Sequence, residues 1–332
     1  MRTSIRRATA ADISQMVALL LLDARARHAL NPSVWPVDAE TESRIEKNLR
    51  KTLEAADAGT KEAWLLAEAN GRMDGVAHAM IVQPPPIYDI VGGPPGLFLD
   101  DCFVRDDAPP ETAEGLLLAM EAALRDRGAA GLIASCPAGG PWRALYERHG
   151  YEQVTLYMAK DGFRRGAPPA GVRPARPDDL PEIVSRSAEH RGMLQTLNDR
   201  FWHIHPQADA RFEAWMRFSL TLTDREMFVA EEADGVNGYV IAQPIAPLLV
   251  PPAHDIAGTG VIDDFYSRDL AIATSLSNGG ASASALLAAA EDVFARHGFA
   301  AALTVCPAAW TSKRMLLERQ GYRTAKLWML KR

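Results

Sequence analysis

The sequence has few cysteines, no excess of positive charge and no long apolar segment. Its three cysteines, Cys102, Cys136 and Cys306, lie far apart in 332 residues, which indicates neither a disulfide framework nor the short spacing of a metal site. We predict that they are reduced thiols in the protein core. The 36 Lys+Arg against 42 Asp+Glu give a formal net charge of −6, which argues against a nucleic-acid partner.

The longest apolar run near the start is interrupted by charged residues. The segment MVALLLLDARARHAL contains Asp23, Arg25 and Arg27, well short of the roughly 20 apolar residues that a membrane span needs. The first residues, MRTSIRRATAADI, include basic residues but not the apolar stretch of a signal peptide. We therefore expect a cytoplasmic protein with no membrane partner.

The chain is long enough for two domains, and its sequence repeats itself. The segment IRRATAADISQMV, from Ile5, resembles VRPARPDDLPEIV, from Val172, and LNPSVW, from Leu30, resembles LNDRFW, from Leu197, at the same separation. Further matches follow in the same order, LDDCFV with IDDFYS and CPAGGPWRALYERHGY with CPAAWTSKRMLLERQGY. Because this period is far longer than that of a solenoid repeat, we infer a duplicated domain.

A segment rich in glycine, proline and charge separates the two copies. It reads KDGFRRGAPPAG at residues 160–171, a composition that is typical of a linker. We place the N-terminal domain at residues 1–166 and the C-terminal domain at residues 167–332.

Each copy shows the same order of predicted elements. An extended start leads into a helix with acidic residues at its beginning, Asp12 or Asp178 and Asp179, and a second helix follows. A hairpin is predicted around NGRMDG or ADGVNG. The strand LFLDDCFV or GVIDDFYS precedes a helix at residues 111–128 or 281–298, and after a further strand and helix a last strand closes the copy. This order predicts an α/β (α+β) fold with a mixed sheet flanked by helices.

Both copies resemble the GCN5-related N-acetyltransferase (GNAT) family over nearly their whole length. The segments LLAAAEDVFARHG and LLLAMEAALRDRG, and the ending LYERHGYEQVTLYMAK, carry the resemblance. It implies two tandem GNAT-like domains, each with a mostly antiparallel mixed sheet, and acetyl-CoA as co-substrate. It also implies that acetyl-CoA enters where the central strand splays from its neighbour, and that a Gln/Arg-x-x-Gly-x-Gly/Ala loop holds the pyrophosphate.

The loop before the 281–298 helix is the candidate phosphate-binding segment. A helix N-terminus carries unpaired amides and a partial positive charge, and glycine or alanine lets a phosphate approach the backbone. The start of an ordinary buried helix is the alternative interpretation. Aligned through two later leucines, the resemblance assigns Phe265 and six loop residues to the cofactor: Asn278, Gly279, Gly280, Ala281, Ser282 and Ala283. Asn278 stands where the family has Gln or Arg, and Ala281 where it has the central glycine.

The corresponding loop of the N-terminal copy departs further from the family motif. It contains Pro109 and Pro110, which lack N–H donors, and Glu111, which would repel a phosphate. We therefore predict a degenerate loop in the N-terminal copy, where a helix start is the favoured interpretation, and cofactor binding in the C-terminal copy.

Acetyl transfer to an amine requires a base for the amine and an acid for the CoA thiolate. The resemblance implies that a tyrosine near the end of the last helix is the acid. Tyr146 occupies this place in one copy and Leu317 in the other, and packing of the Tyr146 ring on the sheet is an equal alternative. In the C-terminal copy, Asp264 or its neighbour Asp263 is the candidate base, and the alternative is that both are solvated turn aspartates. Tyr266, on the same strand face as Asp264, is the candidate substitute acid.

These features predict a CoA-dependent N-acetyltransferase that moves an acetyl group from acetyl-CoA to a small amine, at the C-terminal domain. The alternative is a catalytically silent GNAT-like module that binds a ligand or a partner. No metal is expected, since His203 and His205 lack a third ligand at metal spacing. We expect either a monomer whose copies pair as a pseudo-dimer or a homodimer.

Overall fold

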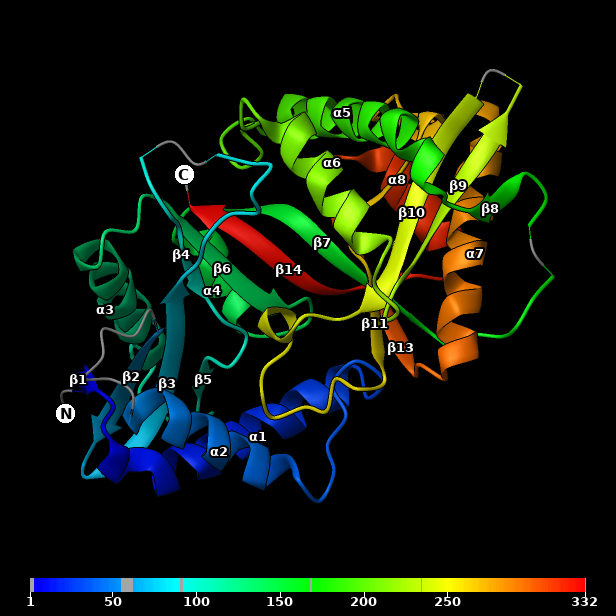
Figure 1. Cartoon of the computed structure of the whole chain (residues 1–332). Helices are drawn as coiled ribbons and strands as arrows, with labels where there is room; N and C mark the ends of the chain where they lie inside the picture. The colour runs from blue at the N-terminus through cyan, green and yellow to red at the C-terminus, as the bar shows by residue number, and fades with distance from the viewer. Residues whose placement is uncertain (1–2, 55–61, 90–91, 168, 234, 332) are drawn as a thin grey trace.

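The computed structural model describes residues 3–54, 62–89, 92–167, 169–233 and 235–331 (Figure 1). The elements of the N-terminal copy are β1 (Ser4–Arg7), α1 (Ile13–Leu30), α2 (Thr41–Glu54), β2 (Glu62–Ala69), β3 (Arg72–Ile81), β4 (Gly96–Phe98), β5 (Phe103–Val104), α3 (Thr112–Asp126), β6 (Leu132–Pro137), α4 (Trp142–Arg148) and β7 (Tyr151–Asp161). Those of the C-terminal copy are β8 (Val172–Pro174), α5 (Leu180–Leu197), α6 (Ala208–Ser219), β9 (Glu226–Glu232), β10 (Gly235–Pro244), β11 (Thr259–Ile262), β12 (Phe265–Ser267), α7 (Ala281–His297), β13 (Ala301–Pro307), α8 (Thr311–Arg319) and β14 (Arg323–Lys331).

The predicted order of elements is confirmed in both copies. The first helices begin as expected, because the Asp12 carboxylate accepts the Thr9 N–H at 2.8 Å and the Asp179 carboxylate accepts the Arg176 N–H at 2.7 Å. The hairpins β2–β3 and β9–β10 lie where the turn residues place them. The cysteines are free and buried, as predicted. Within the described residues, no helix is long and apolar enough to cross a membrane.

The strands predicted over LFLDDCFV and GVIDDFYS are each divided in two. β4 pairs with β3 and, in parallel, with β6, whereas β5 pairs with β3. β11 and β12 repeat this arrangement beside β10. The break falls at the paired aspartates, of which Asp100, Asp101 and Asp264 bond to side chains of other elements. The prediction of one continuous strand was therefore wrong at this point.

Helices cover both faces of the N-terminal half of the sheet. Successive residues of a strand face opposite ways, and in β2 Leu65 lies in the cluster that contains Leu116 and Met120 of α3. The neighbouring Trp64 and Leu66 lie in a second cluster, with residues of α1 and α2. The near-continuous apolar sequence of β2 follows from this burial on both sides.

The two copies exchange their last strands. In the described residues one mostly antiparallel sheet of 14 strands runs through both copies, and its central order is β6-β14-β7-β13. β14 therefore lies between β6 and β7 of the N-terminal copy, and β7 lies between β14 and β13 (Figure 1). The prediction that a last strand closes its own copy was wrong. The domain boundary between residues 166 and 167 stays a prediction. Across this boundary, β14 of the C-terminal copy lies beside β6, and β7 of the N-terminal copy lies beside β13.

Two reciprocal ion pairs fix the exchanged strands. Lys331 of β14 lies 2.5 Å from the Glu121 carboxylate in α3, and Lys160 of β7 lies 2.7 Å from Glu291 in α7. The Glu121 side chain is only 3% exposed and also accepts the Tyr151 hydroxyl at 2.9 Å. Each pair joins the last strand of one copy to a helix of the other.

We expect Lys331→Met to destabilise the whole protein. The substitution removes a cation from the nearly buried Glu121, and a hydrogen bond to a charged group contributes about 1.5–3 kcal/mol. The measurement is the free energy of unfolding in urea. The matched control is Arg217→Met, which breaks an exposed pair with Glu213 and should change stability little. Equal losses in both variants would contradict the role of the Lys331–Glu121 pair.

Candidate functional site

The loop before α3 in the N-terminal copy is a closed turn. The Thr112 N–H donates to the Pro109 carbonyl oxygen at 2.9 Å, and the Ala108 N–H donates to that of Arg105 at 3.1 Å. Pro109 and Pro110 supply no N–H groups. This geometry favours the helix-start interpretation of the loop.

The loop before α7 has a different backbone. A short 3₁₀ turn, η6 (Ser277–Gly280), precedes the helix, and Asn278, Gly279 and Gly280 have φ values of 49°, 65° and 79°. Such left-handed angles favour glycine. A Cβ on Gly279 would meet no atom within 4 Å, whereas a Cβ on Gly280 would lie 3.0 Å from Leu316. The backbone of Gly279 is therefore open to a ligand, while a side chain at Gly280 would crowd Leu316 of α8.

A carboxylate already lies at the start of α7. The buried Asp269 accepts the Ala283 N–H at 3.1 Å, and the Ala281 N–H donates to the Asn278 carbonyl oxygen. The hydroxyl of Ser282 donates to Glu232 at 2.8 Å. A phosphate that used the Ala283 amide would have to displace Asp269, a residue that the motif alignment did not single out.

The second candidate cluster surrounds Asp264, between β11 and β12. Its carboxylate accepts the Tyr239 hydroxyl at 2.8 Å and lies 3.0 Å from Nδ1 of His190 in α5. Burial opposes the charge of Asp264, but the hydrogen bonds from His190 and Tyr239 outweigh it and lower its pKa. The neighbouring Asp263 is exposed, whereas Asp264 makes the contacts with Tyr239 and His190.

His190 completes a carboxylate–imidazole dyad. Burial lowers the pKa of His190, which keeps the ring neutral, with its Nδ1–H donated to Asp264. Nε2 then carries the lone pair, and within the described residues it is buried without a hydrogen-bond partner. This is the arrangement of a general base oriented by a carboxylate. Sequence spacing gave no signal for it, because α5 lies far from Asp264 along the chain.

Two further side chains, Tyr266 and Lys313, lie close to the dyad. The Tyr266 ring stacks on His190 with centroids 5.4 Å apart, and its hydroxyl lies 3.4 Å from Glu189. Burial raises the pKa of Tyr266 to about 12, so the hydroxyl keeps its proton at neutral pH. The buried Lys313 donates to the carbonyl oxygen of Phe265 at 2.9 Å. The backbone carbonyl of Phe265, a predicted cofactor residue, therefore already accepts a hydrogen bond from within the protein.

Tyr146 lies in the core of the N-terminal copy. Its ring is fully buried, with centroids 5.9 Å from Phe98, 5.7 Å from Trp142 and 5.3 Å from Tyr151. The hydroxyl has no hydrogen-bond partner among the described residues, and burial holds its pKa well above the ordinary value. These contacts favour the packing interpretation, and the role of Tyr146 as acid stays a prediction.

The N-terminal copy also joins an aspartate to a histidine, with different chemistry. Nδ1 of His78 lies 2.8 Å from Asp101 and Nε2 lies 3.3 Å from Glu62. Burial opposes a charge on His78, yet the two carboxylates raise its pKa to about 9. The ring is therefore protonated at neutral pH and stacks on Trp64 at 3.6 Å. With both nitrogens donating, His78 cannot act as a base.

The histidines at 203 and 205 take part in local contacts. His203 lies 3.1 Å from Asp199, and Nδ1 of His205 accepts the Gln207 N–H at 2.9 Å. Their backbones bond to the loop after β3 of the other copy, at Asp89 and Ile87. These bonds hold the two copies together.

Comparison with known proteins supports the fold. No protein-family model matches the chain, and no curated protein matches it. A GCN5-related N-acetyltransferase from Sphaerobacter thermophilus aligns with a TM-score of 0.57 and 17% identity, covering 99% of this chain and 95% of that chain. A tandem GNAT protein from the clavulanic acid biosynthesis pathway, solved without AcCoA, aligns with a TM-score of 0.50 and 15% identity, over 99% and 97% of the two chains. The chain therefore has the fold of a tandem GNAT protein.

Proposed function

We propose that this protein is an acyltransferase that moves an acetyl group from acetyl-CoA to a small amine, at the C-terminal copy. The Asp264–His190 dyad carries the proposal, because it provides a neutral, oriented base. The equivalent aspartate of the N-terminal copy holds a protonated histidine instead. The GNAT fold and the open backbone at Gly279 support the same copy.

The residues present fit CoA in part. The first turn of α7 offers backbone N–H groups and the positive end of a helix dipole to a pyrophosphate, and Gly279 leaves the approach clear. Asp269 holds the Ala283 amide, so binding there requires its carboxylate to turn away. The thioester supplies the activated acyl carbon that the amine attacks.

The proton steps are assigned to groups of this chain. Nε2 of His190 accepts a proton from the amine, and the Asp264 carboxylate stabilises the resulting imidazolium. The Tyr266 hydroxyl, protonated at neutral pH and stacked on His190, donates its proton to the departing thiolate. Proton transfer from the His190 imidazolium to the Tyr266 phenolate, directly or through water, then restores both groups. Tyr239 holds Asp264 in place through its hydroxyl.

A silent ligand-binding module is the second candidate. It is favoured by Asp269, whose carboxylate occupies the anion position at the start of α7, and by Lys313, which occupies the carbonyl of Phe265. Under this alternative, the loop of η6 serves only to begin the helix.

We expect Gly279→Asp to weaken acetyl-CoA binding by about tenfold or more, since a carboxylate beside the helix start repels the pyrophosphate. Gly279→Asn is the matched control, because asparagine is of similar size, tolerates a positive φ and adds no charge. The measurement is titration calorimetry with acetyl-CoA. Equal affinities of the two variants, or no binding by the wild-type protein, would support the silent module.

We expect His190→Gln to lower kcat with a small amine acceptor by about 10²–10⁴-fold and to leave acetyl-CoA affinity unchanged. The pKa of His190 lies below its ordinary value, so wild-type kcat/KM should fall as pH drops through the acidic range, where the base becomes protonated. This acid limb should vanish in the variant. His203→Gln is the control, because His203 lies in the same copy with a side chain that is 40% exposed and pairs with Asp199. An unchanged acid limb in His190→Gln would remove His190 from the mechanism.

A further inference from the structure

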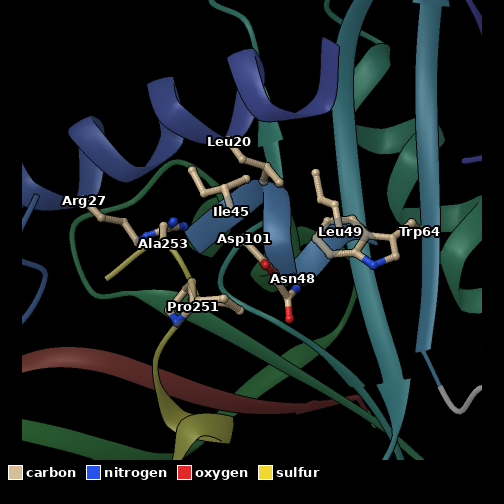
Figure 2. Close-up of a pocket in the computed structure, with 10 residues that line it drawn as sticks. Leu20, Arg27, Ile45, Asn48, Leu49, Trp64, Asp101, Pro251 and Ala253 are labelled. Carbon is tan, nitrogen blue, oxygen red and sulfur yellow. The ribbon is translucent and has the colours of Figure 1, made fainter. Parts of the chain in front are cut away.

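Each copy extends the segment that follows its hairpin onto the other copy. In the C-terminal copy this is the segment 247–253, which contributes to the lining of a cavity of about 270 Å³ and of a small hollow next to it, both against the N-terminal copy. Figure 2 shows Pro251 and Ala253 around the hollow, together with Asp101 of the N-terminal copy. Asp101 is the residue that is equivalent to Asp264 in the repeat.

The corresponding segment of the N-terminal copy, residues 84–89, lies on the C-terminal copy. Two main-chain hydrogen bonds, of 2.8 and 3.0 Å, flank an antiparallel bridge between Tyr88 and Ile204. The donors are the N–H groups of Asp89 and His205, and the acceptors are the carbonyl oxygens of His203 and Ile87, in that order. The backbone of Tyr88 is therefore fixed against the connection between α5 and α6.

An arginine at the same place in each copy anchors the segment of the other copy. Arg211 of α6 donates to the Pro86 carbonyl oxygen at 2.9 Å, and Arg44 of α2 donates to the Ala253 carbonyl oxygen at 3.2 Å. The two arginines occupy equivalent positions of the repeat, so the contact between the copies is reciprocal. Three consecutive prolines, at residues 84–86, further limit the backbone of the N-terminal segment.

The side chain of Tyr88 faces the dyad of the C-terminal copy. The ring is half-buried and packs against the main hydrophobic core. Burial and the negative charges of Asp264 and Asp263 raise the pKa of Tyr88, and the positive charge of Arg191 opposes them. All three charged groups belong to the C-terminal copy. The ring therefore lies on the carboxylate side of the dyad, although Tyr88 itself belongs to the other copy.

Burial governs the protonation of the dyad. It is the main cause that lowers the pKa of His190, and the charges of Lys313 and Arg191 lower it further, whereas Asp264 raises it. The Tyr266 ring already covers one side of the imidazole. The His190 side chain is 8% exposed and that of Asp264 is 23% exposed, so the carboxylate is the more open member. A side chain that covers Asp264 therefore limits the water that reaches the dyad.

We propose that Tyr88 is a positioning residue of the C-terminal site, contributed by the N-terminal copy. Its ring covers the Asp264 carboxylate and excludes water from the dyad. The N-terminal copy, whose own loop before α3 is closed, thereby completes the site of the C-terminal copy. This inference deepens the proposed function and rests on His190 as the base, but the cover itself can be tested without acyl transfer.

An NMR titration of the His190 ring in the full chain, assigned with His190→Gln, tests the cover. We expect Tyr88→Ala to raise the measured pKa of His190 by about 0.5 or more, because entering water relieves burial and screens the neighbouring charges, so the pKa returns upward toward its ordinary value. Tyr88→Phe keeps the ring and should leave the pKa unchanged. The control is Leu248→Ala, in the reciprocal segment on the N-terminal copy. An unchanged pKa in Tyr88→Ala, or equal shifts in Tyr88→Ala and Leu248→Ala, would overturn the proposal.

Kinetics separate this inference from the proposed function. With acetyl-CoA and ethylamine, butylamine or 2-phenylethylamine, the acid limb of kcat/KM should move to higher pH in Tyr88→Ala, while the KM for acetyl-CoA stays unchanged. A wild-type protein that acetylates none of these amines, combined with the expected NMR shift, would count against the proposed function and support the cover. Arg211→Met, which releases the segment at Pro86, is the second variant should Tyr88→Ala fail to fold. It should raise the pKa of His190 as well, and no change there would overturn the proposal.

Discussion

The exchange of the last strands between the copies is the constraint on which the other features depend. Because β14 lies between β6 and β7, the C-terminal copy contributes Lys326 to the buried carboxylate of Asp100. The same crossing lets the segment after β10 reach α1 and α2, where His254 meets Arg27 at 3.1 Å. The halves therefore share one central sheet and one set of buried charges, and neither half has a complete interior without the other.

Within this shared frame, equivalent aspartates have different chemistry. Asp101 and Asp264 follow the same strand position, and each bonds to a histidine from another element. Asp101, with Glu62 as a second carboxylate, raises the pKa of His78 against the effect of burial, whereas burial and the nearby charges of Lys313 and Arg191 lower the pKa of His190. The charges that surround each ring thus decide whether a copy holds a fixed cation or a base.

The sequence predicted what depends on local pattern and left open what depends on tertiary contact. The repeat, the helix starts at Asp12 and Asp179 and the GNAT fold followed from residues close together in the chain. The strand exchange did not, because the apolar pattern of a strand is the same whichever neighbour it pairs with. His190 and Asp269 were missed for a related reason: the fold brings each to its partner from another segment, and no motif spacing marks them.

The duplication gives the chain a surface that a single copy cannot form. The apolar segment 247–252 of the C-terminal copy lines one side of a cavity, while Glu62, His78 and Asp101 of the N-terminal copy line the other. A separated N-terminal copy would keep the carboxylates but lose the apolar side and the Lys326 charge, which would leave Asp100 buried without its cation. The acidic residues of the N-terminal copy therefore depend on β14 and on the segment 247–252, both of which the other copy supplies.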